Sequence, residues 1–102
     1  MIDAVRLLDK PCSAVLRRRV RPEHQAGLGA MARRVAFAGP LTQDDGVTMI
    51  GSLLAIDFAS RDAAEAGLAE EPFTRAGLYA STGIRAFVNL WPQRAGFPEK
   101  QP

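Results

Sequence analysis

Residues Met49–Phe58, which read MIGSLLAIDF, carry the clearest strand pattern in this chain of 102 residues. Positions 52, 54, 56 and 58 fall on one face of such a strand, and the positions between them fall on the other. Leu53 and Leu54 place an apolar side chain on each face. The strand is therefore expected to be covered on both sides.

The segments next to this strand extend the pattern. Val35–Gly39 is predicted as a strand that Pro40 closes, and Asp44-Asp45-Gly46 is typical of the turn that joins it to Met49–Phe58. After the strand, Ser60 is a good N-cap for an alanine-rich helix that reaches about Glu70. A strand, a turn, a strand and a helix thus follow one another.

The N-terminal part of the chain adds another strand and helix. Ile2–Leu8 is predicted as the first strand. Ser13–Val20 is compatible with a helix start, but Pro22 disturbs its continuation, so the favoured helix begins at Pro22 and runs to about Arg34. On it a stripe at i, i+4, i+7 and i+11 is expected to face the sheet: His24, Leu28, Met31 and Val35.

The C-terminal part completes the topology. Phe73–Tyr79 is predicted as a short helical piece and Ile84–Trp91 as the last strand. The order β-α-β-β-α-β is the split βαβ pattern of ferredoxin-like α+β folds, an antiparallel four-stranded sheet with both helices on one face. Residues 1–92 form one domain, and residues 93–102, rich in Pro, Gly and Gln, form a loosely held tail. The uncovered sheet face predicts a homodimer.

Composition limits the classes of function. A net charge of +2 is weakly basic, and its excess lies in Arg17–Arg21, which suits an anionic small molecule or a solvated surface better than a nucleic acid. The single cysteine, Cys12, excludes an internal disulfide and offers no metal-site spacing. No signal peptide and no run of membrane-spanning length is recognised, so a cytoplasmic protein without a membrane partner is expected.

His24 is the single histidine and the natural proton carrier near neutral pH. If the fold brings the turn to the helix start, Asp44 or Asp45 pairs with it, and either aspartate is a candidate. Arg17 and Arg21 are candidates for holding an anionic ligand group, together with the free N–H groups of the first helical turn. Ser52 and Asp9 are candidates for further hydrogen bonds in the same mouth.

Each of these residues also has a plain structural interpretation. A histidine at a helix start is commonly a structural hydrogen-bond donor, and turn chemistry alone explains two aspartates before a glycine. Arginines pair with carboxylates, and a serine in a strand needs no role. The catalytic interpretation is proton abstraction, isomerisation or elimination on a small anionic or phenolic compound, with no metal and no organic cofactor.

A set of short motifs, in this order and spacing, resembles the YciI-like (YCII-related) family from the first strand to the last. The motifs are Asp9-Lys10-Pro11, Arg17, Arg21-Pro22-Glu23-His24, Ala38-Gly39-Pro40-Leu41, Asp44-Asp45-Gly46, Gly51-Ser52, Glu71-Pro72-Phe73 and Ala76-Gly77-Leu78.

The resemblance implies a dimeric α+β barrel of ferredoxin-like domains, a fold shared with muconolactone isomerase. It also implies an active-site dyad of a histidine, which carries over onto His24, and an aspartate, which is Asp44 or Asp45. Three functions follow as hypotheses: a cofactor-independent lyase or isomerase, a homodimer that binds a metabolite without converting it, and a structural interaction module.

Overall fold

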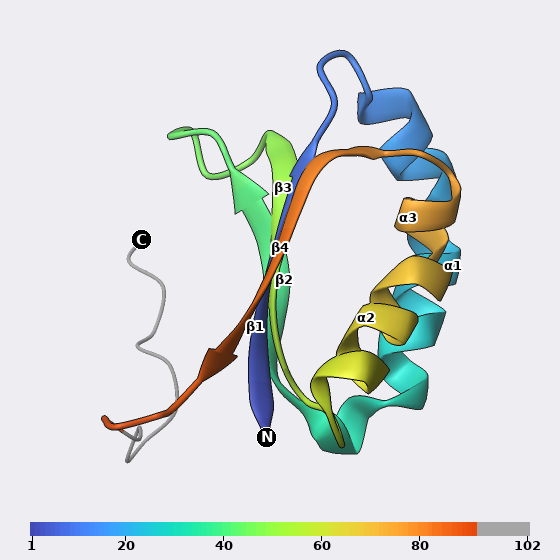
Figure 1. Cartoon of the computed structure of the whole chain (residues 1–102). Coiled ribbons are helices and arrows are strands. Elements are labelled where there is room, and N and C mark those ends of the chain that lie inside the picture. The colour runs from blue at the N-terminus through green and yellow to red at the C-terminus, as the bar shows by residue number, and fades with distance from the viewer. Residues whose placement is uncertain (92–102) are drawn as a thin grey trace.

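The computed structural model describes residues 1–91 and shows a layer of helices packed on one sheet (Figure 1). The elements, in chain order, are β1 (Ile2–Asp9), α1 (Ala14–Ala30), a 3-10 turn (Ala32–Arg34), β2 (Val35–Thr42), β3 (Met49–Asp57), α2 (Arg61–Glu70), α3 (Pro72–Arg75) and β4 (Tyr79–Phe87). The predicted order of strands and helices is confirmed.

The four strands form one antiparallel sheet in the order β2-β3-β1-β4. Val5 of β1 lies opposite Leu54 of β3 on one side and opposite Ile84 of β4 on the other. All three helices lie on the same side of this sheet (Figure 1). The predicted ferredoxin-like α+β fold is therefore confirmed.

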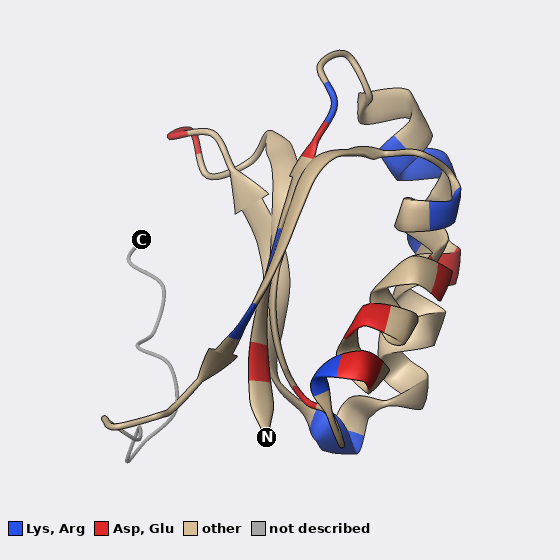
Figure 2. Ribbon diagram, in the orientation of Figure 1, with Lys and Arg blue, Asp and Glu red and all other residues tan. Residues whose placement is uncertain are grey.

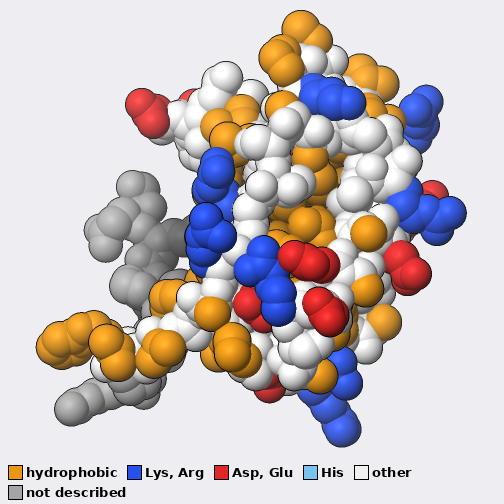
Figure 3. All heavy atoms as spheres, in the orientation of Figure 1, with side chains coloured by type: hydrophobic (Ala, Val, Ile, Leu, Met, Phe, Trp, Pro, Cys, Tyr) orange, Lys and Arg blue, Asp and Glu red, His pale blue; other side chains and the backbone are white. Residues whose placement is uncertain are grey.

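The core lies between the sheet and the helices. Alternate strand residues point into it and are almost fully buried, among them Val5, Leu7, Leu54 and Ile56, and Ala64 of α2 packs against them. Figure 3 shows apolar side chains between the two layers. In residues 1–91 no helix covers the opposite face of the sheet.

Helix α1 differs from its prediction in where it begins. It starts at Ala14, eight residues before Pro22, and Pro22 lies inside it. Proline cannot donate a hydrogen bond to the carbonyl of Arg18, but both residues are exposed, so water can solvate that carbonyl. His24 therefore lies deep inside the helix, and the anion site predicted from free N–H groups beside it is wrong.

Several other boundaries also differ from those predicted. Strand β2 continues through Pro40 to Thr42, because an edge strand tolerates a proline. The helical piece predicted over Phe73–Tyr79 ends at Arg75, and the last strand ends at Phe87 rather than at Trp91.

Ser60 caps α2 as expected, because its Oγ accepts a hydrogen bond from the N–H of Ala63 at 3.0 Å. Strand β4 begins at Tyr79, five residues earlier than predicted, because Gly77 ends the preceding turn with φ of +77° and Tyr79 already pairs with Asp9. The predicted tail, residues 93–102, lies outside the described residues.

Charged side chains lie mainly on the helices and loops, and the strands carry few of them (Figure 2). Within residues 1–91, no helix combines the length and the apolar character that a membrane crossing requires.

Gly51 allows strands β1 and β3 to approach closely. It lies opposite Leu8, at the end of the sheet that Arg17 of α1 contacts. A Cβ atom at this position would lie 2.2 Å from the carbonyl oxygen of Leu7, which is far inside van der Waals contact. Only glycine fits there without a backbone shift. The carbonyl of Gly51 itself accepts a hydrogen bond from Arg17 at 2.7 Å.

We expect Gly51→Ala to lower the free energy of unfolding by more than about 2 kcal/mol, because the strands must separate to admit the methyl group. Urea denaturation measures the change. Gly39→Ala is the matched control, since a Cβ at this strand position meets no atom within 4 Å. Equal stabilities of the two variants would contradict the close approach.

Candidate active site

Arg17 is a buried cation at the junction of α1 with the sheet, only 6 % exposed. Its Nε donates to Asp9 Oδ2 at 2.7 Å, and its Nη2 donates to Ser52 Oγ at 2.9 Å and to the carbonyl of Gly51. A buried charge needs this kind of pairing, because an unpaired one would cost several kcal/mol. Three of the predicted site residues, Arg17, Asp9 and Ser52, thus form one network.

Phe73 connects Arg17 to His24. Its ring is fully buried at the start of α3, and the guanidinium carbon of Arg17 lies 4.8 Å from the ring centre. The imidazole of His24 stacks on the same ring, with centres 4.3 Å apart and planes at 23°. Arg17 and His24 are seven residues apart, two turns of α1, so they lie on one face of the helix.

His24 pairs with Glu71, the residue that precedes α3. Nδ1 of the imidazole and Oε1 of Glu71 share a hydrogen bond, and both side chains are largely buried. A carboxylate at Nδ1 holds the proton on that nitrogen in the neutral ring and leaves the lone pair on Nε2. Nε2 makes no hydrogen bond to any of residues 1–91.

The second oxygen of Glu71 is also held. Oε2 accepts from the N–H of Thr74 at 3.2 Å and from the hydroxyl of Tyr79 at 3.3 Å. Burial alone would raise the pKa of Glu71, but the hydrogen bond and the charge of His24, followed by backbone N–H groups, outweigh it and lower the pKa below its ordinary value of 4.5. Glu71 is therefore an ionised, fixed partner for the imidazole.

Tyr79 completes this arrangement from β4. Burial, followed by the negative charge of Glu71, raises the pKa of Tyr79 above its ordinary value of 10.0. The phenol therefore stays protonated at neutral pH and acts as a donor to the carboxylate.

A cavity of about 170 Å³ opens beside the imidazole, between α1 and strands β2 and β3. We call it the polar cavity, because Arg17, Arg21, His24, Gln25 and Ser52 line it together with backbone and apolar groups of the two strands. Arg21 is exposed at its mouth and makes no ion pair within residues 1–91. The predicted gathering of histidine, arginines and serine at one site is present in the structure.

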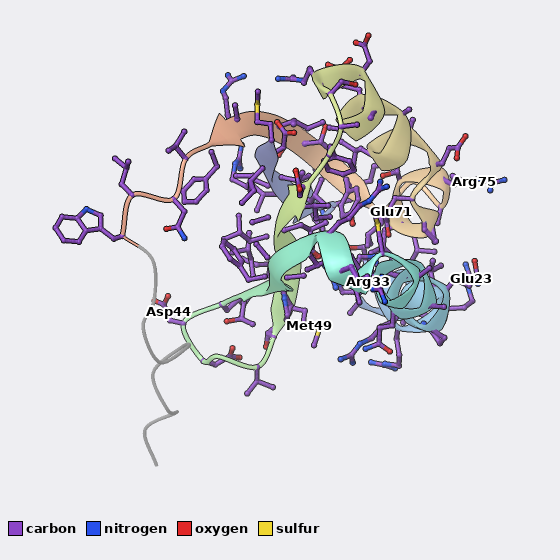
Figure 4. All side chains as sticks on the ribbon, turned by 90° about the horizontal axis from the view of Figure 1, so that it is seen from below. Glu23, Arg33, Asp44, Met49, Glu71 and Arg75 are labelled. Atoms are coloured by element: carbon purple, nitrogen blue, oxygen red, sulfur yellow. The ribbon has the colours of Figure 1, made fainter. Side chains whose placement is uncertain are left out.

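The two turn aspartates lie away from this site. Asp45 accepts hydrogen bonds from the Thr48 hydroxyl and from the N–H groups of Val47 and Thr48. These bonds lower the pKa of Asp45, and the bond from the hydroxyl has the largest effect. Asp44 lies on the exposed hairpin, on the other side of the molecule from Glu71 (Figure 4). The predicted pairing of a turn carboxylate with the imidazole is not formed, because Asp45 is used in its own turn and Glu71 occupies Nδ1.

Glu71, Phe73 and Tyr79 were missed as site residues. A signal for the first exists in the sequence, where Glu71 precedes Pro72. A carboxylate followed by proline marks a helix start, and Glu71 is the N-cap of α3. Nothing in the linear pattern shows that the start of α3 packs against α1 at His24. No cluster of three His, Cys, Asp or Glu side chains with the geometry of a metal site occurs in residues 1–91.

Comparisons with known proteins agree with this fold. The model of the YCII-related domain matches residues 4–88. No curated protein matches the chain. Among solved structures, the chain is similar to 5-chloro-2-hydroxyhydroquinone dehydrochlorinase (TftG) from Burkholderia phenoliruptrix AC1100 in complex with 2,5-dihydroxybenzoquinone. The TM-score is 0.80 at 28 % identity, and the match covers 86 % of this chain and 94 % of that one.

The lowered pKa of Glu71 predicts a stability that depends on pH. A carboxyl group whose pKa is lower in the folded than in the unfolded chain stabilises the fold fully above its ordinary value of 4.5, and this contribution is lost as the pH falls through the lower folded value. We expect Glu71→Gln to lower the free energy of unfolding by about 1–3 kcal/mol at neutral pH, and the difference from wild type to shrink in acid. Urea denaturation over a pH series measures it.

Glu70→Gln is the control for this series, because Glu70 is adjacent, exposed and without a hydrogen bond to any side chain of residues 1–91. Its stability is expected to stay within about 0.5 kcal/mol of wild type. Parallel pH profiles for Glu71→Gln and wild type would show that the carboxylate does not hold the imidazole.

Proposed function

We propose, from the premise that this chain belongs to the YCII-related domain family, that it is a small-molecule enzyme of the lyase or isomerase type. In this proposal the Nε2 atom of His24 accepts and returns a proton on a small anionic or phenolic ligand in the polar cavity. The observation that carries the proposal is the buried His24–Glu71 pair at the wall of that cavity.

The pair supports acid–base chemistry because its geometry is fixed before a ligand arrives. Glu71 holds Nδ1, Phe73 holds the plane of the ring, and Nε2 makes no hydrogen bond within residues 1–91. A general base needs a correct tautomer and a fixed direction, and such a group contributes about 10²–10⁴ in rate. The role that the sequence assigned to Asp44 or Asp45 passes in this proposal to Glu71.

The arginines support an anionic or phenolic ligand. The hydrogen bonds of Arg17 to Asp9, Gly51 and Ser52 use Nε and Nη2, while Nη1 makes none within residues 1–91. Arg21 adds a second cation at the mouth of the same cavity. Positive charge beside a base stabilises the oxyanion that forms when the base removes a hydroxyl proton.

The chemistry balances without an external oxidant. For a halogenated hydroquinone, the imidazole first passes a hydroxyl proton to the ring carbon that carries the halide. It then removes a second hydroxyl proton, the electron pair of that O–H bond moves through the ring, and the halide leaves with the electrons of its bond. The ring becomes a quinone, and the imidazole gives the second proton to water. An isomerisation uses the first transfer alone.

The similar structure supports the same class of reaction. That protein is a dehydrochlorinase of a chlorinated hydroxyhydroquinone, and its structure was solved with a dihydroxybenzoquinone. The chlorinated compound is a small phenolic ring, and the polar cavity has a volume suited to one such ring. Our proposal extends the reaction class, and not the particular substrate, to this chain.

We further propose that two chains associate through the open face of the sheet. The strand residues that alternate with the core positions point to this face: the apolar Ala4, Leu8, Leu41 and Leu53, together with the cations Arg6 and Arg85. The apolar part of this face is favourably buried against a second copy of itself, with the two arginines reaching to its rim.

We expect His24→Gln to lower kcat at least about 100-fold for elimination from halogenated hydroxyhydroquinones, while the Kd for 2,5-dihydroxybenzoquinone stays within about threefold. Chloride release from 5-chloro-2-hydroxyhydroquinone measures turnover, and calorimetry measures binding. Glu23→Gln is the matched control, because Glu23 lies on the outer side of the same helix (Figure 4). Binding without turnover in wild type would favour a metabolite-binding protein, and full activity of His24→Gln would refute the base.

We expect the chain to sediment at about twice its mass of 11.0 kDa, and Leu53→Arg to sediment as a monomer, because it removes an apolar side chain and adds a second cation directly opposite Arg6. Val15→Arg is the control, since Val15 is a 71 % exposed aliphatic residue on α1. Analytical ultracentrifugation measures all three proteins. A monomeric wild type at micromolar concentration would overturn this association.

A further inference from the structure

A second cavity, of about 210 Å³, lies between α1, α2 and the sheet. We call it the apolar cavity, because its polar side chains are limited to His24, Glu70 and Glu71. The rest of its wall is apolar, with Val5, Leu28, Met31, Leu54, Ile56 and Phe58 as its main contributors. Water gains few hydrogen bonds in such a space, so an apolar group that enters it is favoured.

The two cavities meet at the imidazole. His24, Leu28 and Leu54 line both of them, so the polar and the apolar cavity adjoin at these three side chains. Glu71 lines only the apolar cavity. It therefore holds the ring from one compartment, while the arginines lie around the other.

The volumes suit a ligand with two unlike ends. An apolar cavity of about 150 Å³ is large enough for one benzene ring, so each compartment accommodates a single ring or a short chain. We infer that the apolar cavity binds a short apolar substituent of the ligand whose phenolic or anionic group occupies the polar cavity. The substrate class is then a substituted monocyclic phenol or hydroxyquinone. The assignment of the polar end rests on the proposed function.

Gly27 is exposed and lines the apolar cavity. It lies one turn after His24 on α1, and a Cβ atom at this position would meet no heavy atom within 4 Å. A larger side chain at position 27 would therefore meet no clash, and where it turns toward the apolar cavity it would occupy part of that space. Gly67, on the opposite wall, differs, because a Cβ there would lie 3.3 Å from the ring of Phe58. Gly27 is therefore the glycine of this wall at which the cavity can be filled without a clash.

The test compares the binding of phenol and 4-ethylphenol, with Kd values from NMR titrations. Each buried carbon of the ethyl group is expected to tighten binding about fourfold, so wild type should bind 4-ethylphenol about fifteenfold more tightly than phenol. Gly27→Leu should reduce this ratio to less than about twofold and leave the Kd for phenol within about twofold of wild type. No preference in wild type, or an unchanged ratio in a folded Gly27→Leu protein, would overturn the inference.

Gly29→Leu is the matched control, because Gly29 lies on the same helix, also meets no atom within 4 Å and lines neither cavity. It should keep the wild-type ratio. If Gly27→Leu does not fold, the pair Gly27→Ala and Gly29→Ala decides, and equal ratios for these two would overturn the inference. Turnover of His24→Gln bears on the proposed function alone, so the two ideas fail separately.

Discussion

The burial of one guanidinium group determines how the helix layer sits on the sheet. Arg17 is enclosed at the end of β1 and β3, and its charge must be paired there. Asp9 supplies the charge, and Ser52 and the carbonyl of Gly51 supply the remaining acceptors. Because these partners come from two neighbouring strands, α1 has one position in which all of them are satisfied.

The position of α1 also determines where the imidazole of His24 lies. Two turns after Arg17, His24 reaches the core side of the same helix, and Phe73 lies against both side chains. The short helix α3 therefore packs on α1 through an aromatic ring, and its N-cap residue, Glu71, meets Nδ1 of the imidazole. The geometry of the candidate base thus depends on a cation that takes no proton itself. A structural ion pair and a candidate catalytic pair share one ring.

The fold was largely predictable because it depends on local patterns. Alternation over Met49–Phe58 and the cap at Ser60 appear in the structure where the sequence places them. The start of α1 was not predictable from Pro22, because the contacts that Arg17 and His24 make on either side of the proline offset its cost inside the helix. Contacts between α1 and distant parts of the chain thus outweighed the local tendency of proline to begin or break a helix.

The candidate site was predictable only in part, for the same reason. His24, Arg17 and Ser52 could be singled out by residue type, and the structure brings them to one cavity. The partner of the imidazole could not, because 47 residues separate His24 from Glu71 and the closer Asp44 and Asp45 offer the same chemistry. Glu71 is the carboxylate that reaches the imidazole because α3 packs on α1, and no local residue pattern predicts this packing.

The two ultraviolet chromophores of the chain lie in very different surroundings. Trp91, the single tryptophan, is 91 % exposed, whereas Tyr79, the single tyrosine, donates its hydroxyl to Glu71 inside the fold. Indole fluorescence therefore reports little on the interior, and the absorbance of tyrosinate is the optical signal of the region around the imidazole. Because the pKa of Tyr79 is raised in the folded chain, its ionisation in alkaline solution opposes folding, so the spectrum and the stability change together.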